Sequence, residues 1–242
     1  MDSAILIGRD DERRLLHGLM RQKKNVLIVG AEGVGKSLLV EDAIAAGAVK
    51  NFLHSRSSTT LKETLVNLVG SASSGKDLQK KNILTLKKSC YRLLDNDPEY
   101  VVLDQVGWVE PKFYGFLTYM KERNIPFVIA ARQSGKKNVG HLWMGLYDYE
   151  ILQIKNLDQA KTAQLVDHYA AMFDLSMEAE PSFKKDVFRF SEGNPKIVKE
   201  ICRLAADEKY HVRGYIDVNL VDLDRRINLS MTGISLHSDH SR

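Results

Sequence analysis

Residues 30–37 read Gly-Ala-Glu-Gly-Val-Gly-Lys-Ser, a complete G-x-x-x-x-G-K-[ST] pattern. An apolar run at residues 26–29 precedes the pattern, and a helix-like stretch at residues 37–43 follows it. A strand, a glycine-rich turn and a helix in this order form a phosphate-binding loop. Glycines let the backbone wrap closely around an anion, and the N-terminus of the helix favours negative charge. The stretch therefore predicts that the chain binds the phosphates of a nucleoside triphosphate.

Two side chains of the pattern carry the chemistry that this ligand needs. Lys36 is expected to reach the β- and γ-phosphates, and the Ser37 hydroxyl is expected to ligate Mg²⁺. The alternative is a glycine-rich turn that binds nothing, and the flanking strand and helix argue against it. The residues predicted to hold the nucleotide here are Gly30, Ala31, Glu32, Gly33, Val34, Gly35, Lys36, Ser37 and Leu38.

The composition is that of a folded protein with a mildly basic surface. Of the 242 residues 44% are hydrophobic, and the formal net charge is +4 with an isoelectric point near 8.9. No apolar run is long enough to span a bilayer, and the first residues lack the basic region of a secretion signal. The two lone cysteines, Cys90 and Cys202, suit buried thiols. We therefore expect a cytoplasmic protein without a membrane partner, whose charge permits nucleic-acid contact without requiring it.

The order of the patterns predicts an α/β core followed by a helical region. Strands and helices alternate up to residue 155, which indicates a parallel five-stranded sheet covered on both faces. From residue 157 the pattern is helical only, so we expect a P-loop core at 1–155, a small all-helical lid at 156–229 and a flexible tail at 230–242. His237 and His240 in that tail are expected to be unstructured rather than metal-binding. The expected strands are 26–29, 51–54, 100–103, 126–130 and 149–154, and the expected lid helices are 157–172, 183–190, one beginning at Pro195, and 218–229.

The third expected strand ends in an acid, Asp104. A carboxylate at the end of a buried strand is what Mg²⁺ bridging two phosphates requires, so Asp104 is a second predicted metal-binding residue beside Ser37. The next residue is Gln105, which cannot act as a base at neutral pH but can orient water. We therefore predict slow hydrolysis, with a catalytic carboxylate from elsewhere in the chain as the alternative.

A basic segment follows the fourth expected strand. Residues 132–137 read Arg-Gln-Ser-Gly-Lys-Lys and predict a basic loop near the edge of the sheet where the phosphates bind. Arg132 is placed there to sense the γ-phosphate and to stabilise charge during transfer, and the alternative is an ordinary surface arginine. The residues predicted to act in catalysis are Lys36, Asp104, Gln105 and Arg132.

Several further segments resemble the AAA+/STAND group of P-loop ATPases, which includes archaeal-type ATPases, origin-recognition proteins and transposition regulators. Ile7-Gly8-Arg9-Asp10-Asp11-Glu12 is similar to the opening motif of that group, residues 157–169 to the start of its helical lid, and Gly193-Asn194-Pro195 to its lid signature. Ala130-Ala131-Arg132 looks more like the strand end of STAND proteins. The resemblance implies that Ile7, Gly8 and Arg9 lie beside adenine, so that the nucleotide is ATP, and that Pro195 approaches the base and Lys196 the phosphate.

The resemblance leaves two functions open. The first is an ATP-dependent switch that associates with double-stranded DNA, self-associates in its ATP state and recruits or activates an effector protein of transposition or replication. The second is a STAND-like signalling or scaffold ATPase that acts through protein partners only. A third possibility is a subunit that holds ATP as structure. An arginine supplied by a neighbouring copy is implied as well, and the spacing does not choose among Arg92, Arg123 and Arg189.

Overall fold

The computed structural model describes residues 6–72, 77–175, 181–212 and 215–237. The chain divides into two compact units, Met1–Lys155 and Asn156–Arg242. Each unit has its own buried apolar side chains and is described here by itself. Across the described residues, no helix combines the length and the apolar character needed to cross a membrane.

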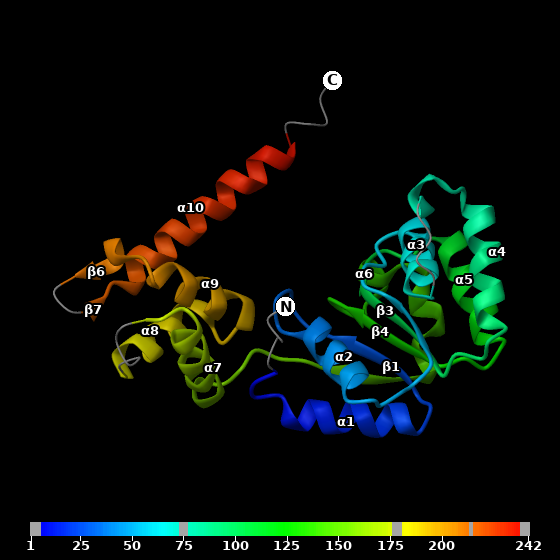
Figure 1. The fold of residues 1–242 in the computed structure, drawn as a ribbon, viewed down its shortest axis with the longest axis horizontal. Coiled ribbons are helices and arrows are strands. Elements are labelled where there is room, and N and C mark those ends of the chain that lie inside the picture. Colours follow the sequence, from blue (N-terminus) through cyan, green and yellow to red (C-terminus); the bar gives the residue numbers. More distant parts are fainter. Residues whose placement is uncertain (1–5, 73–76, 176–180, 213–214, 238–242) are drawn as a thin grey trace. The chain divides into compact units, whose positions relative to one another are not determined.

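The first unit is built on a parallel sheet whose strand order is β2-β3-β4-β1-β5. Figure 1 labels β3, β4 and β1 of this sheet. β1 lies between β4 and β5 in this order, pairing Leu27 with Ile129 of β4 on one side and with Ile151 of β5 on the other. Since every pair is parallel, all five strands end at the same edge, where ligands of such sheets bind. The strands are β1 (Asn25–Val29), β2 (Phe52–Ser55), β3 (Tyr100–Val106), β4 (Phe127–Ala131) and β5 (Tyr149–Gln153).

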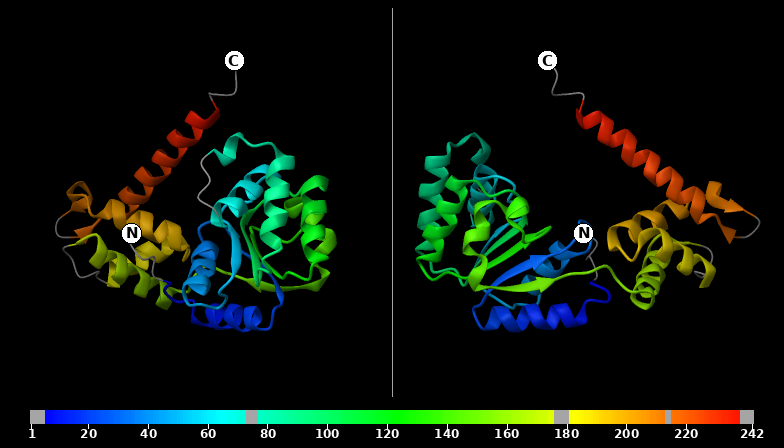
Figure 2. Two further views of the ribbon diagram at one scale, coloured as in Figure 1. Left: turned by 45° about the vertical axis from the view of Figure 1, so that its right-hand side comes forward. Right: turned by 180° about the vertical axis from the view of Figure 1, so that it is seen from behind.

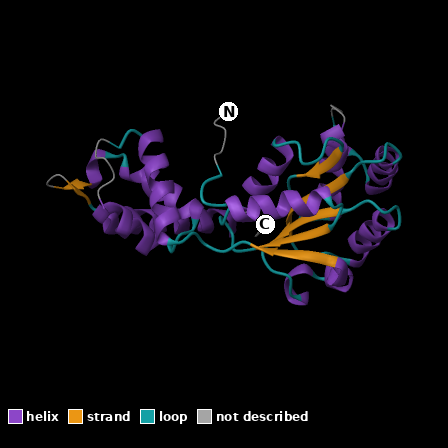
Figure 3. Cartoon of the chain, turned by 90° about the horizontal axis from the view of Figure 1, so that it is seen from below, coloured by secondary structure: helices purple, strands orange, loops and turns teal. Residues whose placement is uncertain are grey.

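Helices cover both faces of the sheet, because the strands are apolar on both faces. Leu27 and Val29 of β1 belong to one buried cluster, with α3 (Leu61–Ala72), α4 (Ile83–Leu94) and α5 (Pro111–Lys121). Val26 and Ile28 belong to the other, with α1 (Asp10–Arg21) and α2 (Lys36–Ala45). Figure 2 shows these two helical layers, and Figure 3 shows the strands running between them.

The second unit is a group of helices with a short hairpin. Asp158 and Asn194 cap two of the helices, accepting hydrogen bonds from the backbone N–H groups of Lys161 and Lys196. The buried side chains include Val166, Val187, Ile201 and Val221. The elements are α7 (Gln159–Met172), α8 (Pro181–Ser191), α9 (Pro195–Ala205), β6 (His211–Val212), β7 (Tyr215–Ile216) and α10 (Val218–His237), with a 3₁₀ turn at Glu208–Tyr210.

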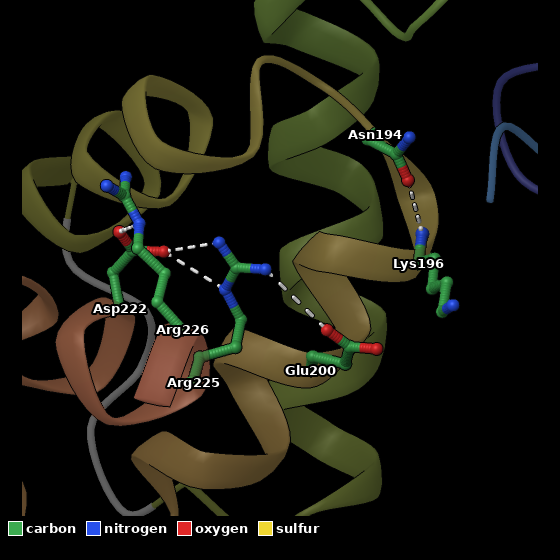
Figure 4. A network of polar contacts seen from close by, with 6 residues as sticks. All are labelled: Asn194, Lys196, Glu200, Asp222, Arg225 and Arg226. Atoms are coloured by element: carbon green, nitrogen blue, oxygen red, sulfur yellow. Dashed lines mark hydrogen bonds and ion pairs between the residues drawn. The ribbon is translucent and has the colours of Figure 1, made fainter. Parts of the chain in front are cut away.

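A buried ion pair lies within α10, and its arginine also contacts α9 (Figure 4). Asp222 Oδ1 accepts hydrogen bonds from Arg225 Nε at 3.0 Å and Nη2 at 2.6 Å, and Asp222 Oδ2 lies 2.7 Å from Arg226 Nε. Arg225 also lies 3.8 Å from Glu200 on α9. Both charges of the central pair are almost fully buried, and each has its partner within the unit.

The predicted fold class, a P-loop α/β core with a parallel five-stranded sheet followed by a helical region, is confirmed. Three local predictions differ from the structure. The predicted basic loop is partly helical, because Lys136 begins α6 (Lys136–Val139). A 3₁₀ helix follows at His141–Asp148, and it was not predicted because its repeat of three residues differs from that of an α-helix. The hairpin β6–β7 was not predicted, because strands of two residues show no alternation.

The last helix is longer than predicted. The sequence placed its end at Leu229, but α10 continues to His237. Its polar residues do not stop it: Ser230 is accommodated because its hydroxyl donates to the carbonyl of Ile227 within the helix, at 2.7 Å. His237 is therefore helical, and the expectation for His240 lies outside the described residues.

Candidate nucleotide-binding site

The glycine-rich segment joins the end of β1 to the start of α2. Gly30 must be glycine, because a Cβ there would stand 2.4 Å from the carbonyl oxygen of Ile154, just after β5. The Ile154 N–H donates to the carbonyl of Val29 at 2.7 Å and fixes this close approach. Gly35 has φ +102°, a conformation that favours glycine, and directly precedes α2. The loop therefore has the tight backbone path that the motif predicts.

Lys36 lies against the loop that precedes it. Its Nζ donates to the carbonyl oxygens of Gly30 and Ala31, at 2.8 Å each. Burial lowers the pKa of Lys36 from its usual value; Asp104 and Glu32 oppose this shift, and Arg132 adds to it. The structure thus brings four charged side chains from three separate segments together at one edge of the sheet. A bound phosphate would raise the pKa of Lys36 and hold the amine in its charged form.

Asp104 lies in β3 and is 4% exposed. Its Oδ1 accepts a hydrogen bond from the Gln105 N–H at 2.7 Å, and no described residue forms an ion pair with it. Buried carboxylates are normally paired or bind a cation, and an oxygen ligand suits Mg²⁺. Ser37, the second residue of α2, supplies the hydroxyl expected at such a site. Because the described residues contain no group of three or more His, Cys, Asp or Glu side chains suited to a metal, phosphate and water oxygens would complete the coordination.

Gln105 occupies a bulge that the sequence did not predict. Leu103 pairs with Ile129, but the next pair is Val106 with Ala131, so β3 contains one extra residue between these two pairs. Gln105 has φ +52°, in the left-handed region that costs a non-glycine residue about 1 kcal/mol. The bulge places Asp104 in the interior and leaves Gln105 exposed.

Arg132 directly follows β4 and forms an ion pair with Glu32 of the phosphate loop. Its side chain is largely exposed, so this pair adds little to stability. The contact nevertheless holds the guanidinium beside the loop, at the edge where all the strands end. Its predicted action on the γ-phosphate remains a proposal.

Arg9 has a structural position that the sequence did not predict. It is buried at the start of α1, and its Nη1 lies 2.9 Å from Glu12 Oε1. Its Nη2 donates to the carbonyl oxygens of Val34 at 3.0 Å and of Lys155 at 2.5 Å. Arg9 therefore links the phosphate loop to the last residue of the first unit. These partners lie 25 and 146 residues away in the chain, so no local pattern could have identified them. Ile7 and Gly8 precede it, partly buried.

The Gly193-Asn194-Pro195 segment fixes the start of the second unit. Gly193 has φ +75°, and a Cβ there would stand 1.9 Å from the carbonyl oxygen of Leu157. The Leu157 N–H donates to the carbonyl of Gly193 at 2.9 Å. Pro195 opens α9, and Lys196 follows it with its N–H bonded to Asn194 Oδ1 (Figure 4). The segment thus has a packing role within its unit, and the approach of Pro195 and Lys196 to a nucleotide remains a proposal.

Comparison with known proteins identifies the fold. No family model matches the sequence, and no curated protein matches it. The Aeropyrum pernix ORC2 protein, solved as ADPNP-ADP complexes, is similar over 90% of this chain and 67% of its own, with 14% identity and a TM-score of 0.61. The Aeropyrum pernix ORC1 protein in complex with DNA is similar over 91% of this chain and 66% of its own, with 12% identity and a TM-score of 0.60.

The replication initiator DnaA, bound to AMPPCP and single-stranded DNA, gives 15% identity, coverage of 92% and 66%, and a TM-score of 0.56. A point mutant of Thermotoga maritima RuvB gives 12% identity, coverage of 89% and 69%, and a TM-score of 0.56. The chain spans about two thirds of the length of each of these solved chains. All are AAA+ P-loop ATPases, and this chain shares their fold.

Proposed function

We propose that the chain is an ATP-binding, slowly hydrolysing molecular switch that associates with DNA and recruits or activates a partner protein. One observation carries the proposal: the phosphate loop with Lys36 meets a buried Asp104 without an ion-pair partner among the described residues, at one edge of the sheet. A loop that bound a nucleotide only for structural stability would not need a second group, such as the Asp104 carboxylate, that can bind Mg²⁺.

Each residue of the site has a role in this function. The loop amides and Lys36 hold the phosphates, and Ser37 and Asp104 hold Mg²⁺, which supplies charge neutralisation when bound. Arg132 stabilises charge at the γ-phosphate, and Gln105 orients water without accepting its proton. The similarity of residues 7–12 to the AAA+ opening motif favours adenine as the base, with Pro195 and Lys196 contributing from the second unit.

Arg9 connects the phosphate loop to the segment that leads to the second unit. Because it bonds both to Val34 of the loop and to Lys155, a change in the loop on nucleotide binding alters the anchor of the segment that leads to the second unit. We propose that ATP orders this unit, exposes the surface for the effector and promotes self-association, and that hydrolysis reverses these changes. The two fully buried thiols suit a cytoplasmic protein.

The nucleotide site is tested by Lys36→Ala. We expect loss of at least about 100-fold in ATP affinity, measured by calorimetry, because the loop loses its charged contact to the phosphates. Lys24→Ala is the matched control, since Lys24 is exposed and precedes β1 at the opposite edge of the sheet. Undiminished ATP binding by Lys36→Ala would remove the site assignment.

DNA association is tested with labelled duplex DNA by fluorescence anisotropy, with an ATP analogue and with ADP, across a series of salt concentrations. We expect binding with the analogue that weakens steeply with salt, because Lys and Arg contacts to phosphates release counterions. The STAND-like alternative, in which only protein partners are used, is favoured by Arg132 at the strand end. The absence of DNA binding in both nucleotide states would select it.

A further inference from the structure

We propose that single-stranded nucleic acid binds across an exposed surface formed by Trp108, Lys136, Lys137 and Trp143, here called the tryptophan surface. The proposal rests on the proposed association with DNA and identifies the form of nucleic acid and the residues that contact it. Trp108 is 58% exposed and Trp143 is 52% exposed, although large indoles are usually mostly buried. Neither residue belongs to the nucleotide site.

Backbone hydrogen bonds bring the two tryptophan-bearing segments together. The His141 N–H donates to the carbonyl of Val109 at 2.9 Å, and the Val109 N–H donates to the carbonyl of Val139 at 3.3 Å. Val109 and Gly140 form an isolated parallel bridge. The loop after β3, which carries Trp108, therefore runs beside the segment that leads to Trp143.

Gly140 fixes the approach between these segments. A Cβ on Gly140 would stand 2.5 Å from the carbonyl oxygen of Val109 and 3.1 Å from Cδ2 of Trp108, so the indole packs against the glycine backbone. The backbone N–H of Trp143 donates to the carbonyl of the same glycine at 3.2 Å. The Trp108 indole packs against Gly140, and the backbone of Trp143 is hydrogen-bonded to the same residue, so the two tryptophan-bearing segments meet at Gly140.

The charge beside the tryptophans suits phosphates. Lys136 and Lys137 are exposed on α6, immediately before Gly140, and neither forms an ion pair with any residue that the structure describes. Glu110 is an exposed acid beside Trp108, whereas Asp148 is already paired with Lys121 at 2.8 Å. Two lysines without described ion-pair partners therefore remain to contact a backbone of negative charge.

Indoles beside lysines favour a single strand over a duplex or a protein. Bases of a single strand expose flat faces that stack on aromatic side chains, while the lysines follow the backbone. A duplex hides those faces and would use only the lysines. A protein partner would cover the tryptophans but would leave the lysine pair unexplained.

The chain contains only two tryptophans, and both lie on this surface, so intrinsic tryptophan fluorescence reports on it alone. A dT oligonucleotide is titrated into the full chain with an ATP analogue, and fluorescence and anisotropy of a labelled oligonucleotide are recorded in parallel. We expect quenching with the same midpoint as the anisotropy, and tighter binding of the single strand than of a duplex of equal length. Trp143→Ala should weaken binding about tenfold, and Trp143→Phe should retain most of it.

The lysines are tested through salt. Lys136→Gln with Lys137→Gln should reduce the slope of log affinity against log salt by about 1.4, since each phosphate contact to a single strand contributes about 0.7. Lys23→Gln with Lys24→Gln makes the same change of charge at the opposite edge of the sheet and should leave the slope unchanged.

The outcomes separate this proposal from the proposed function. Nucleotide-dependent DNA binding without quenching, or unaffected by Trp143→Ala, overturns the tryptophan surface and leaves the switch intact. Equal affinity for duplex and single strand overturns the proposal that bases stack on Trp108 and Trp143. Absence of binding to either form overturns both DNA association and this surface.

Discussion

The two units bury charge in different ways. In the second unit Asp222 is buried and accepts two hydrogen bonds from Arg225, so its charge is neutralised by a residue of the same unit. In the first unit Asp104 is equally buried, but its hydrogen bond comes from the neighbouring Gln105 N–H, and no described cation pairs with it. The same residue type therefore has its counter-charge within the chain in the second unit, and has no ion-pair partner among the described residues in the first.

This difference gives a criterion for separating a binding site from a structural ion pair. A buried carboxylate loses the stabilisation of water, and its protein environment must restore it or a bound cation must. Asp222 has its compensation within the chain. Asp104 lies at the edge of the sheet, beside the loop and Lys36, where Mg²⁺ would supply it.

The largest difference between the two units is expected when each buried aspartate is replaced by alanine. Asp222→Ala should lower the free energy of unfolding of the second unit by about 3 kcal/mol, because Arg225 stays buried with only the more distant Glu200. Asp104→Ala should change stability by less than about 1 kcal/mol, because it removes one hydrogen bond together with a buried charge that has no ion-pair partner among the described residues. The same change should abolish Mg²⁺-dependent hydrolysis. Urea unfolding and an ATPase assay measure the two effects.

Each unit carries its own reporter for this test. Cys90 in the first unit and Cys202 in the second are fully buried, and burial raises the pKa of each thiol to about 12. Neither thiol should react at neutral pH until its unit opens, so peptide-level thiol labelling follows the units separately. If Asp104→Ala exposed Cys90 as readily as Asp222→Ala exposes Cys202, the criterion would fail.

Gly193 in the second unit and Gly47 in the first have similar positive φ angles but different surroundings. Gly193→Ala should destabilise the second unit by about 3 kcal/mol, because the new Cβ meets the Leu157 carbonyl at 1.9 Å in addition to the strain of φ +75°. Gly47→Ala in the first unit, at φ +69° with no atom within 4 Å, should cost only about 1 kcal/mol. Thiol labelling of Cys202 and Cys90 measures the loss of stability in Gly193→Ala and Gly47→Ala, respectively. Equal losses would show that the strain of a positive φ, and not the clash with Leu157, determines the effect.

The sequence predicted best what neighbouring residues specify. The strand, loop and helix around Lys36 are continuous in the chain, and the apolar strand containing Asp104 has a local signature, so the fold class followed. The contacts of Arg9 with Val34 and Lys155, and the contact of Arg225 with Glu200, depend on how separate elements of the chain pack together. No periodicity contains them.

The bulge at Gln105 was missed for a related reason. The strand pattern predicted an end at residue 103, because the polar residues Asp104 and Gln105 interrupt the apolar run there. Pairing with β4 instead continues to Val106, and the extra residue is absorbed at a positive φ. The end of β3 is therefore determined by its pairing with β4, which a single sequence does not show.

Gln105→Glu should have the smallest effect on stability of these variants, and it tests the hydrolysis chemistry without altering the fold. Gln105 is exposed, so a carboxylate of the same shape adds no buried charge, and stability should change by less than about 0.5 kcal/mol. A glutamate placed beside Asp104 supplies the base that glutamine lacks, so turnover measured by phosphate release should rise several-fold. The matched variant Gln105→Asn, which keeps an amide but shortens it, should lower turnover. An unchanged or lower rate in Gln105→Glu would contradict the prediction that a missing base at residue 105 limits hydrolysis.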